Sequence, residues 1–120
     1  DGHPMEALRK KLARLGVCDS RSILEVPNRA TVVVSGLVIA RQQPQTANGT
    51  VFLLLEDEHG HVNVIVPRTL AGKDREAMKH AMVILVLGRV ERNGPMLQVV
   101  GSRFQALQVE GLTYNSRDFR

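Results

Sequence analysis

The chain has 120 residues and a formal net charge of +4, from 16 lysines and arginines against 12 aspartates and glutamates. This length fits one domain with a single core and excludes two, and the modest basic surplus favours polyanionic partners without identifying them. Because Cys18 is the only cysteine, an internal disulfide is excluded, and a reducing compartment such as the cytoplasm is expected.

No stretch of the sequence approaches the roughly 18–20 apolar residues that a membrane-spanning helix needs. The amino end also lacks the pattern of a signal peptide. We therefore expect a soluble, cytoplasmic protein with no membrane partner. The chain begins at Asp1 rather than at methionine, so we further expect a piece of a longer polypeptide with other domains upstream.

Residues 1–29 are predicted to form a helical segment that links the chain to those upstream domains. The first helix is predicted from its apolar residues, which recur at helical spacing: Met5, Leu8, Leu12 and Leu15. Pro4 suits its first turn and Gly16 suits its end. Its basic residues are expected on the solvated face: Arg9, Lys10, Lys11 and Arg14. Asp19 or Ser20 is a candidate cap for a second short helix that ends near Val26.

Three strands are predicted next, over residues 31–41, 51–55 and 62–66. Gly36 lies inside the first apolar run and permits a bend or bulge, which would let one long strand serve both sides of a closed barrel. The connection over residues 42–50 contains Pro44 and the turn pair Asn48-Gly49. The connection over 56–61 is predicted to be a tight hairpin turn.

A short helix over residues 69–81 and two strands over 83–92 and 96–107 complete the pattern, and Asn93-Gly94 predicts a hairpin between these strands. Three strands, a helix and two strands are the order of the OB-fold, a five-stranded Greek-key barrel. We therefore predict a mainly β fold with a barrel over residues 30–108. The tail over 109–120 either lies against the barrel or stays mobile.

The sequence also carries a family likeness, in VSGLVIARQQ at 34–43, Pro44, Thr46, Ala47, Gly49, Phe52, LEDEHG at 55–60 and NVIV at 63–66, with GHPM at 2–5 and SRDF at 116–119. This string resembles the carboxyl-terminal OB domain of bacterial C-family DNA polymerases (the DNA polymerase III alpha type), and most of all their error-prone, damage-induced branch. The family pattern has a bulky aromatic after the third strand. This chain has Pro67-Arg68 there and no tryptophan.

The resemblance implies a part of a DNA-directed DNA polymerase, a nucleotidyltransferase that acts in translesion synthesis, DNA repair and replication during DNA-damage-induced mutagenesis. It places the catalytic domain and its Mg²⁺ upstream, with no cofactor and no catalytic residue in this fragment. The sequence agrees, since it has no glycine-rich phosphate loop, serine elbow or Cys-His pair. The implied partners are single-stranded DNA, the upstream polymerase domains and a mutagenesis accessory protein.

OB barrels bind single strands on the outer face of strands two and three and at the loops beside it. If Leu53 and Leu55 point inward, Phe52 points outward as a stacking platform, although core packing is an equal alternative for it. Asn63 is the polar candidate on strand three. The remaining candidates donate hydrogen bonds to phosphates and base edges: Arg41, Gln42, Gln43, Thr46 and Asn48 near the first loop, Arg68 in place of the missing aromatic, Arg89, Arg92 and Asn93 near the second loop, and Arg103 on the last strand. With few aromatic residues, weak and salt-sensitive binding is expected.

The acidic run Glu56-Asp57-Glu58 and the pair His59 and His61 are the other candidates for chemistry. Neighbouring carboxylates at a strand end point in different directions, and two histidines leave a tetrahedral zinc site half empty. A structural turn is therefore favoured over a metal site.

Two other functions fit the same fold, because OB barrels host many activities. The domain can serve as a protein-docking module, using an edge strand, the first helix or the tail to hold a mutagenesis partner or another polymerase domain. It can also bind transfer RNA, as OB domains of some synthetases do. The connected string above argues against the transfer RNA alternative.

Overall fold

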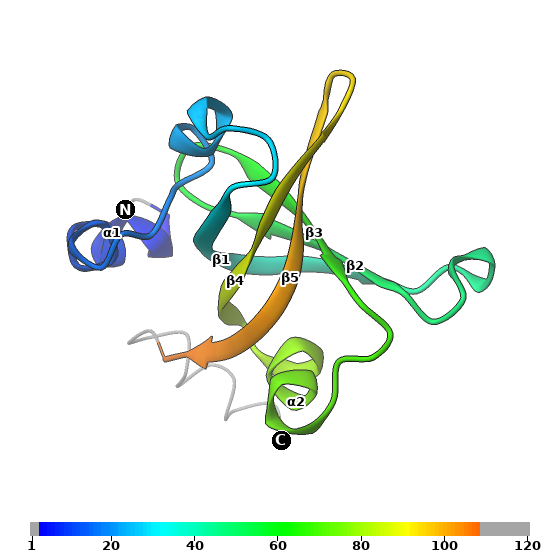
Figure 1. The fold of residues 1–120 in the computed structure, drawn as a ribbon. Coiled ribbons are helices and arrows are strands. Elements are labelled where there is room, and N and C mark those ends of the chain that lie inside the picture. Colours follow the sequence, from blue (N-terminus) through cyan, green and yellow to red (C-terminus); the bar gives the residue numbers. More distant parts are fainter. Residues whose placement is uncertain (1–2, 109–120) are drawn as a thin grey trace.

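The computed structural model describes residues 3–108, apart from the side chains of Pro4, Ala7 and Leu8. Three strands are followed by a helix and two further strands, in the predicted order (Figure 1). In chain order the elements are α1 (Pro4–Arg14), η1 (Ser22–Glu25), β1 (Thr31–Gln42), η2 (Gln45–Ala47), β2 (Val51–Glu56), β3 (His61–Val66), α2 (Gly72–His80), β4 (Val83–Asn93) and β5 (Met96–Leu107).

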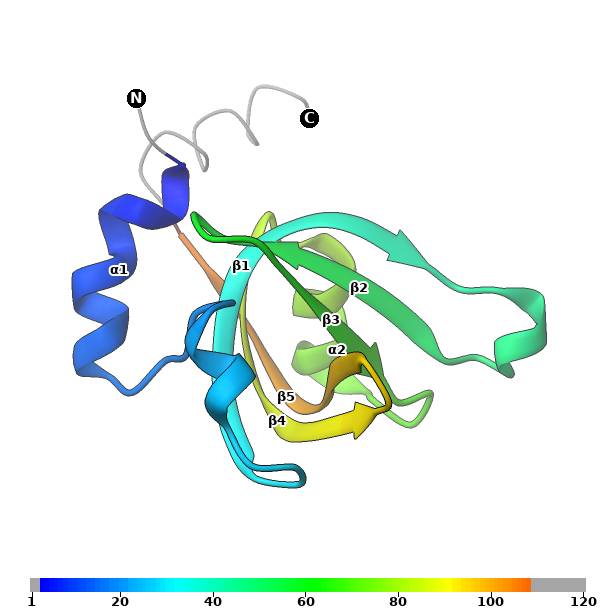
Figure 2. The same ribbon diagram turned by 90° about the horizontal axis from the view of Figure 1, so that it is seen from above.

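The strands close into a barrel in the order β1-β2-β3-β5-β4 (Figures 1 and 2). Neighbouring strands are antiparallel except β3 and β5, which run parallel over three residue pairs. Met78 and Ala81, at the end of α2, belong to the barrel core, so this helix plugs one end of the barrel. A closed five-stranded barrel with a helix between its third and fourth strands is the OB-fold, and the predicted fold class is confirmed.

As predicted, β1 is one long strand that serves both sides of the barrel, although its irregularity lies at Ile39 and not at Gly36. Residues 31–37 of β1 pair with β4 and residues 37–42 pair with β2, so one strand serves both sides of the barrel. A Cβ atom on Gly36 would lie 2.9 Å from the carbonyl oxygen of Glu56, closer than side chains tolerate. The pairing register shifts between Val38 and Ala40, which leaves the exposed Ile39 as an extra residue in the strand.

Alternation along β2 and β3 divides these strands into an inner and an outer face. Val51, Leu53 and Leu55 of β2, and Val62, Val64 and Val66 of β3, are all buried in the core. Fully burying one such side chain stabilises the fold by about 1.5–3 kcal/mol. The intervening residues therefore face outward, and Phe52 is 36% exposed. The core alternative for Phe52 is wrong.

Two predictions about the first helix are wrong. Leu15 is 68% exposed, because α1 ends at Arg14 and the chain leaves the helical stripe after it, while Met5 and Leu12 are buried as expected. Arg9 does not lie on a solvated face. Its side chain is only 16% exposed, because it forms an ion pair of 2.8 Å with Glu58 in the β2–β3 connection.

The second predicted helix is reduced to one 3-10 turn, η1. Neither candidate is its N-cap, which is Arg21 and forms no side-chain cap hydrogen bond. The Oδ1 atom of Asp19 accepts hydrogen bonds from the backbone N–H groups of Arg21 and Ser22 in the turn that leads into η1. The other candidate cap, Ser20, is directed to Asp57 instead.

Two further boundaries differ from the sequence prediction. Helix α2 begins at Gly72 rather than at residue 69, because Leu70 donates a backbone hydrogen bond to Pro67 in a preceding turn. The β4–β5 hairpin is confirmed, but Asn93 still pairs with Met96, so the turn residues are Gly94, at φ 63°, and Pro95.

Cys18 is half-buried and lies beside Val34. Within residues 3–108, no helix is long and apolar enough to span a membrane. The predicted tail over 109–120, with its SRDF string, lies outside the described residues, as does Gly2.

Candidate nucleic-acid interface

A continuous row of outward-facing residues crosses four strand pairings of the barrel. The pairing registers connect Gln42 of β1, Phe52 of β2, Ile65 of β3, Val100 of β5 and Arg89 of β4 in that order. Gln42, Phe52 and Arg89 are exposed, and the two aliphatic residues between them are half-buried. An aromatic and aliphatic centre with polar ends suits a ligand that has flat apolar rings and charged linkers.

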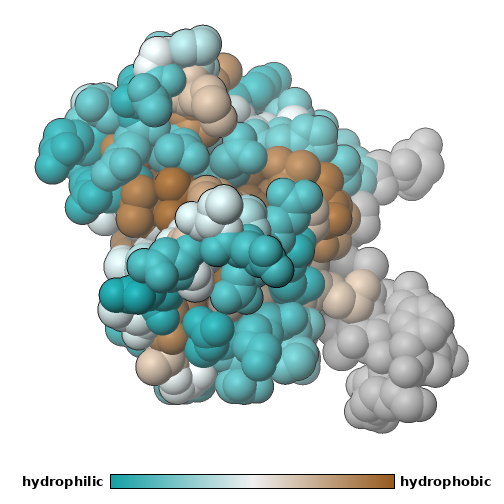
Figure 3. All heavy atoms as spheres, turned by 90° about the vertical axis from the view of Figure 1, so that its right-hand side faces the viewer, coloured by the Kyte–Doolittle hydropathy of each residue, from teal (hydrophilic) through white to brown (hydrophobic). Residues whose placement is uncertain are grey.

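A second, more polar row lies beside the first. It connects Ala40, Leu54, Asn63, Gln98 and Glu91 through the same strand pairings. Asn63 is exposed, as predicted. Figure 3 views the molecule from the side on which the β1–β2 connection protrudes, and apolar side chains gather there in a band between hydrophilic areas.

The β1–β2 connection borders this face with polar residues. Gln43, Thr46 and Asn48 are exposed, and Asn48 adopts the left-handed conformation at φ 55° just before Gly49. A Cβ atom on Gly49 would lie 3.2 Å from the Cβ of Arg68. The exposed Arg68 therefore lies against this connection, which brings together two parts of the predicted site that are distant in sequence.

Arg41 is exposed, but its guanidinium is directed to the end of α2 and not to the outer rows. It pairs with Leu53, between the positions of Ala40 and Gln42 that belong to the two rows. Its Nε donates to the carbonyl oxygen of Met78 at 2.7 Å and its Nη2 to that of Ala81 at 2.5 Å. Burial lowers the pKa of this guanidinium. Arg41 thus caps the C-terminal end of α2, where orphan carbonyl groups favour a cation.

Arg92 is also engaged in holding the fold. Its Nη2 donates to the carbonyl oxygens of Leu24 and Val26 at 2.7 and 2.8 Å, and its backbone N–H donates to Asn28 Oδ1 at 2.9 Å. These bonds attach the segment before β1 to the β4–β5 hairpin. Asn93, the next residue, is exposed at the end of β4.

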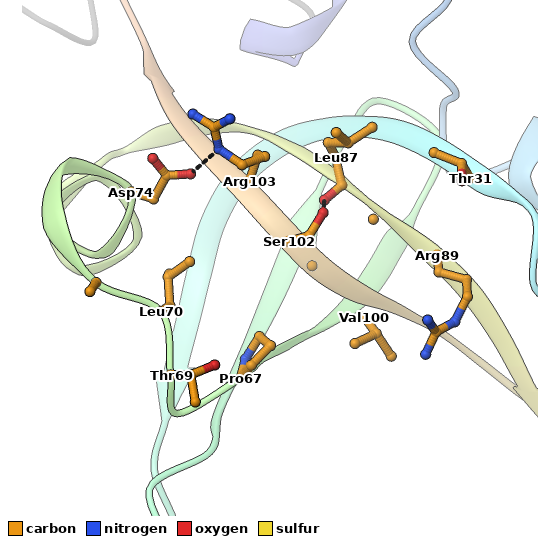
Figure 4. Close-up of a pocket in the computed structure, with 13 residues that line it drawn as sticks. Thr31, Pro67, Thr69, Leu70, Asp74, Leu87, Arg89, Val100, Ser102 and Arg103 are labelled. Carbon is orange, nitrogen blue, oxygen red and sulfur yellow. Dashed lines mark hydrogen bonds and ion pairs between the residues drawn. The ribbon is translucent and has the colours of Figure 1, made fainter.

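Arg89 and Arg103 line a groove of about 810 Å³ beside the first outer row (Figure 4). Its walls come from the β3–α2 connection and from β4 and β5, and Val100 belongs to both the groove and the row. Gly88 and Gly101, which pair with each other across β4 and β5, are buried residues of its floor. A Cβ atom on Gly88 would lie 2.5 Å from the carbonyl oxygen of Val100, so the close approach of β4 and β5 requires glycine.

The acidic run predicted to be structural forms a hydrogen-bonded network. Asp57 is buried and accepts hydrogen bonds from Ser20, His59 and Gly60. Its burial opposes ionisation, but these hydrogen bonds outweigh that effect and lower the pKa of its carboxyl group. The hydrogen bond from Arg9 likewise lowers the pKa of Glu58.

Within residues 3–108, no group of three or more His, Cys, Asp or Glu side chains comes together in a way that could hold a metal ion. The carboxylate oxygens of Asp57 are already bonded to Ser20 and to backbone N–H groups. The described residues therefore do not fit the Mg²⁺ of a polymerase catalytic centre.

Several residues of this face were missed by the sequence prediction. Val100 and Gln98 lie on it only because β5 pairs in parallel with β3, a long-range register that no local pattern reveals. Ile65 and Leu54 also lie on this face, through their pairing with Phe52 and Asn63, but they were not among the predicted contacts. Asp74, which pairs with Arg103, carried no local signal.

The barrel and its outer face define an OB-fold nucleic acid binding domain. The family model of that description matches residues 32–107, and the chain belongs to this family. Along almost its whole length the chain is similar to bacterial error-prone DNA polymerases. It is 40% identical over 120 residues to the error-prone DNA polymerase of Pseudomonas syringae pv. tomato and 38% identical over 120 residues to that of Methylococcus capsulatus. The resemblance to the error-prone branch is thereby confirmed.

These alignments cover 98% of this chain and 12% of each polymerase, so the chain spans about 12% of the length of the curated relatives it matches. Among solved structures, asparaginyl-tRNA synthetase from Pyrococcus horikoshii is similar with a TM-score of 0.61 and 19% identity, over 78% of this chain and 23% of that chain. At this identity the likeness concerns the fold alone.

Proposed function

We propose that this domain binds single-stranded DNA as the template-holding OB domain of an error-prone C-family DNA polymerase. The observation that carries the proposal is the outer row from Gln42 to Arg89, with the exposed Phe52 inside it. Membership of a nucleic acid binding family and similarity to error-prone polymerases along the chain support the same assignment.

In the proposed complex a base stacks on Phe52, which is worth about 1–3 kcal/mol per base. Ile65 and Val100 extend the apolar surface beside it. Arg68 and Arg89 are positioned at the border of the face for phosphate oxygens, and Asn48 and Asn63 for base edges. These contacts have no fixed sequence code, which suits a domain that must hold any template.

The parent protein, on this proposal, is a cytoplasmic DNA-directed DNA polymerase that acts in translesion synthesis and DNA-damage-induced mutagenesis. Nucleotidyl transfer and the Mg²⁺ it requires belong to a catalytic domain outside this chain. The OB domain contributes by tethering, because a weak linked contact raises the local concentration of template for the whole assembly.

Fluorescence anisotropy of a labelled single-stranded oligonucleotide, at low and high salt, tests the proposal. We expect saturable binding that weakens with salt and that Phe52→Ala reduces about 5- to 150-fold, the equivalent of one lost stacking contact. Leu15→Ala is the matched control, since Leu15 is an exposed apolar residue on the far end of α1. Equal effects of the two substitutions, or no binding at low salt, would contradict the proposal.

A protein-docking module is the second candidate, and one observation favours it. Leu15, Leu24 and Met96 are 68%, 59% and 54% exposed and none of them belongs to the two outer rows. Upstream polymerase domains or a mutagenesis accessory protein are the proposed partners. If no oligonucleotide binds while the parent polymerase loses stability or accessory-protein binding on Leu15→Ala or Leu24→Ala, docking is supported instead. Preferential binding of RNA over DNA of the same sequence would favour transfer RNA.

A further inference from the structure

Both arginines of the groove are held by carboxylates of the same chain. Arg103 Nε donates to Asp74 Oδ2 at 2.9 Å, as Figure 4 shows, and the backbone N–H of Phe104 donates to the same oxygen at 2.9 Å. Arg89 Nη2 similarly donates to Glu91 Oε2 at 2.7 Å. A guanidinium and a backbone N–H that converge on one anionic oxygen are the donors with which proteins bind phosphate.

Resting on the proposed function, we propose that this groove is a second binding site for the nucleic-acid backbone and that Asp74 occupies its phosphate position in the free domain. When a single strand enters, a phosphate displaces the Asp74 carboxylate from Arg103 and from the Phe104 N–H. The domain is therefore partly self-inhibited, because its own carboxylate competes with the ligand.

The groove lies next to the outer row, which favours a single-stranded nucleic acid as its ligand. Val100 lines the groove and is also the partner of Ile65 in the outer row. A single-stranded nucleic acid that lies across Phe52 and Ile65 would therefore continue directly into the groove. Thr31, Thr69 and Ser102 contribute hydroxyl groups to the lining of the groove. The groove volume of about 810 Å³ is within the range of about 300–1,000 Å³ typical of ligand sites.

Arg103 is exposed enough to exchange the Asp74 carboxylate for a phosphate. The Arg103 side chain is 67% exposed, whereas the Asp74 side chain is only 14% exposed, so the arginine remains reachable from solvent while paired. Ion pairs at such exposed positions are weak and are screened by salt. A phosphate that is also held by the neighbouring outer row has the advantage of a linked contact and displaces the carboxylate.

The test compares Asp74→Asn with Glu76→Gln in anisotropy titrations of a labelled oligothymidylate of roughly a dozen nucleotides, within the usual site size of an OB domain. Glu76 is the matched control because it lies on the same helix, its side chain is 67% exposed, and it does not line this groove. We expect Asp74→Asn to tighten binding several-fold at low salt, because the phosphate no longer has to displace a carboxylate from Arg103. Glu76→Gln should leave the affinity nearly unchanged.

Arg103→Gln and the double variant Asp74→Asn/Arg103→Gln complete a mutant cycle, with thermal unfolding of each variant as a check on folding. The double variant should lose the gain that Asp74→Asn produces. Equal effects of Asp74→Asn and Glu76→Gln would overturn the inference. So would thymidine triphosphate that competes as well as the oligonucleotide, since the groove would then be a nucleotide site.

The outcomes separate this inference from the proposed function. Wild-type binding that depends on Phe52 but does not change with Asp74→Asn overturns the inference alone. Binding that appears only when Asp74 is replaced supports the self-inhibited groove. An absence of binding in every variant overturns both proposals.

Discussion

Ser20 is bonded to Asp57 through two hydrogen bonds, one of 2.7 Å from its backbone N–H and one of 2.6 Å from its hydroxyl group. The two residues are buried, and they join the segment before the barrel to the β2–β3 turn. Arg9 reinforces this junction from α1, at 3.6 Å from the Asp57 carboxylate. These contacts hold the N-terminal segment against the β2–β3 turn of the barrel.

Replacing Asp57 should change how stability depends on pH. The hydrogen bonds lower its pKa in the folded state, so it contributes stability at pH values above its unfolded pKa of about 3.9. That contribution is lost as the pH falls below this value towards the folded pKa. We expect Asp57→Asn to reduce the free energy of unfolding at pH 7 and to flatten its decline below about pH 4. Urea unfolding across this range measures both effects, and an unchanged pH profile would contradict the assignment.

Arg41→Ala should destabilise the fold more than it weakens DNA binding. The substitution removes two charge-assisted hydrogen bonds to α2, with an expected loss of about 1–3 kcal/mol in the free energy of unfolding. Gln42→Ala is the control, because Gln42 is exposed on the outer row. Chemical denaturation should show a large effect for Arg41 and almost none for Gln42. A stable Arg41→Ala variant with much weaker DNA binding would place Arg41 in the interface instead.

Arg68→Gln should weaken oligonucleotide binding without loss of stability. Arg68 is exposed beside the β1–β2 connection, and among the described contacts its side chain forms no ion pair. Loss of one phosphate contact would make the salt slope shallower by about 0.7. Arg14→Gln, an exposed arginine at the end of α1, serves as the charge-matched control. Identical salt slopes for the two variants would argue against a contact at Arg68.

Gly88→Ala should destabilise the barrel, because the new methyl group would meet the carbonyl oxygen of Val100 and the Cγ1 of Val99. Overpacking of this kind typically costs about 1–3 kcal/mol. Gly94→Asn is the comparison, since Gly94 has no atom within 4 Å of a Cβ position and asparagine tolerates its positive φ. Thermal unfolding should separate the two variants, and equal melting temperatures would refute the close approach at Gly88.

The order of strands, and the role of β1 on both sides of the barrel, could be predicted because they depend on local apolar patterns and a single glycine. The outward direction of Phe52 and Asn63 followed from alternation once the burial of Leu53 was known. The roles of Arg41 and Arg92 could not be predicted, since their hydrogen-bond partners lie 37 to 68 residues away in sequence. An arginine near a loop has the same local pattern whether it binds phosphate or caps a helix.

The short parallel seam between β3 and β5 has a consequence for dynamics. It is closed by three residue pairs, whereas β4 and β5 are joined by eleven, so the barrel should open first along this seam during local unfolding. The proposed path of the strand crosses the seam between Ile65 and Val100. Bound single-stranded DNA would therefore stabilise the pairing of β3 with β5. It should slow hydrogen exchange at the amides of Val64 and Val99 more than at amides of the β4–β5 hairpin.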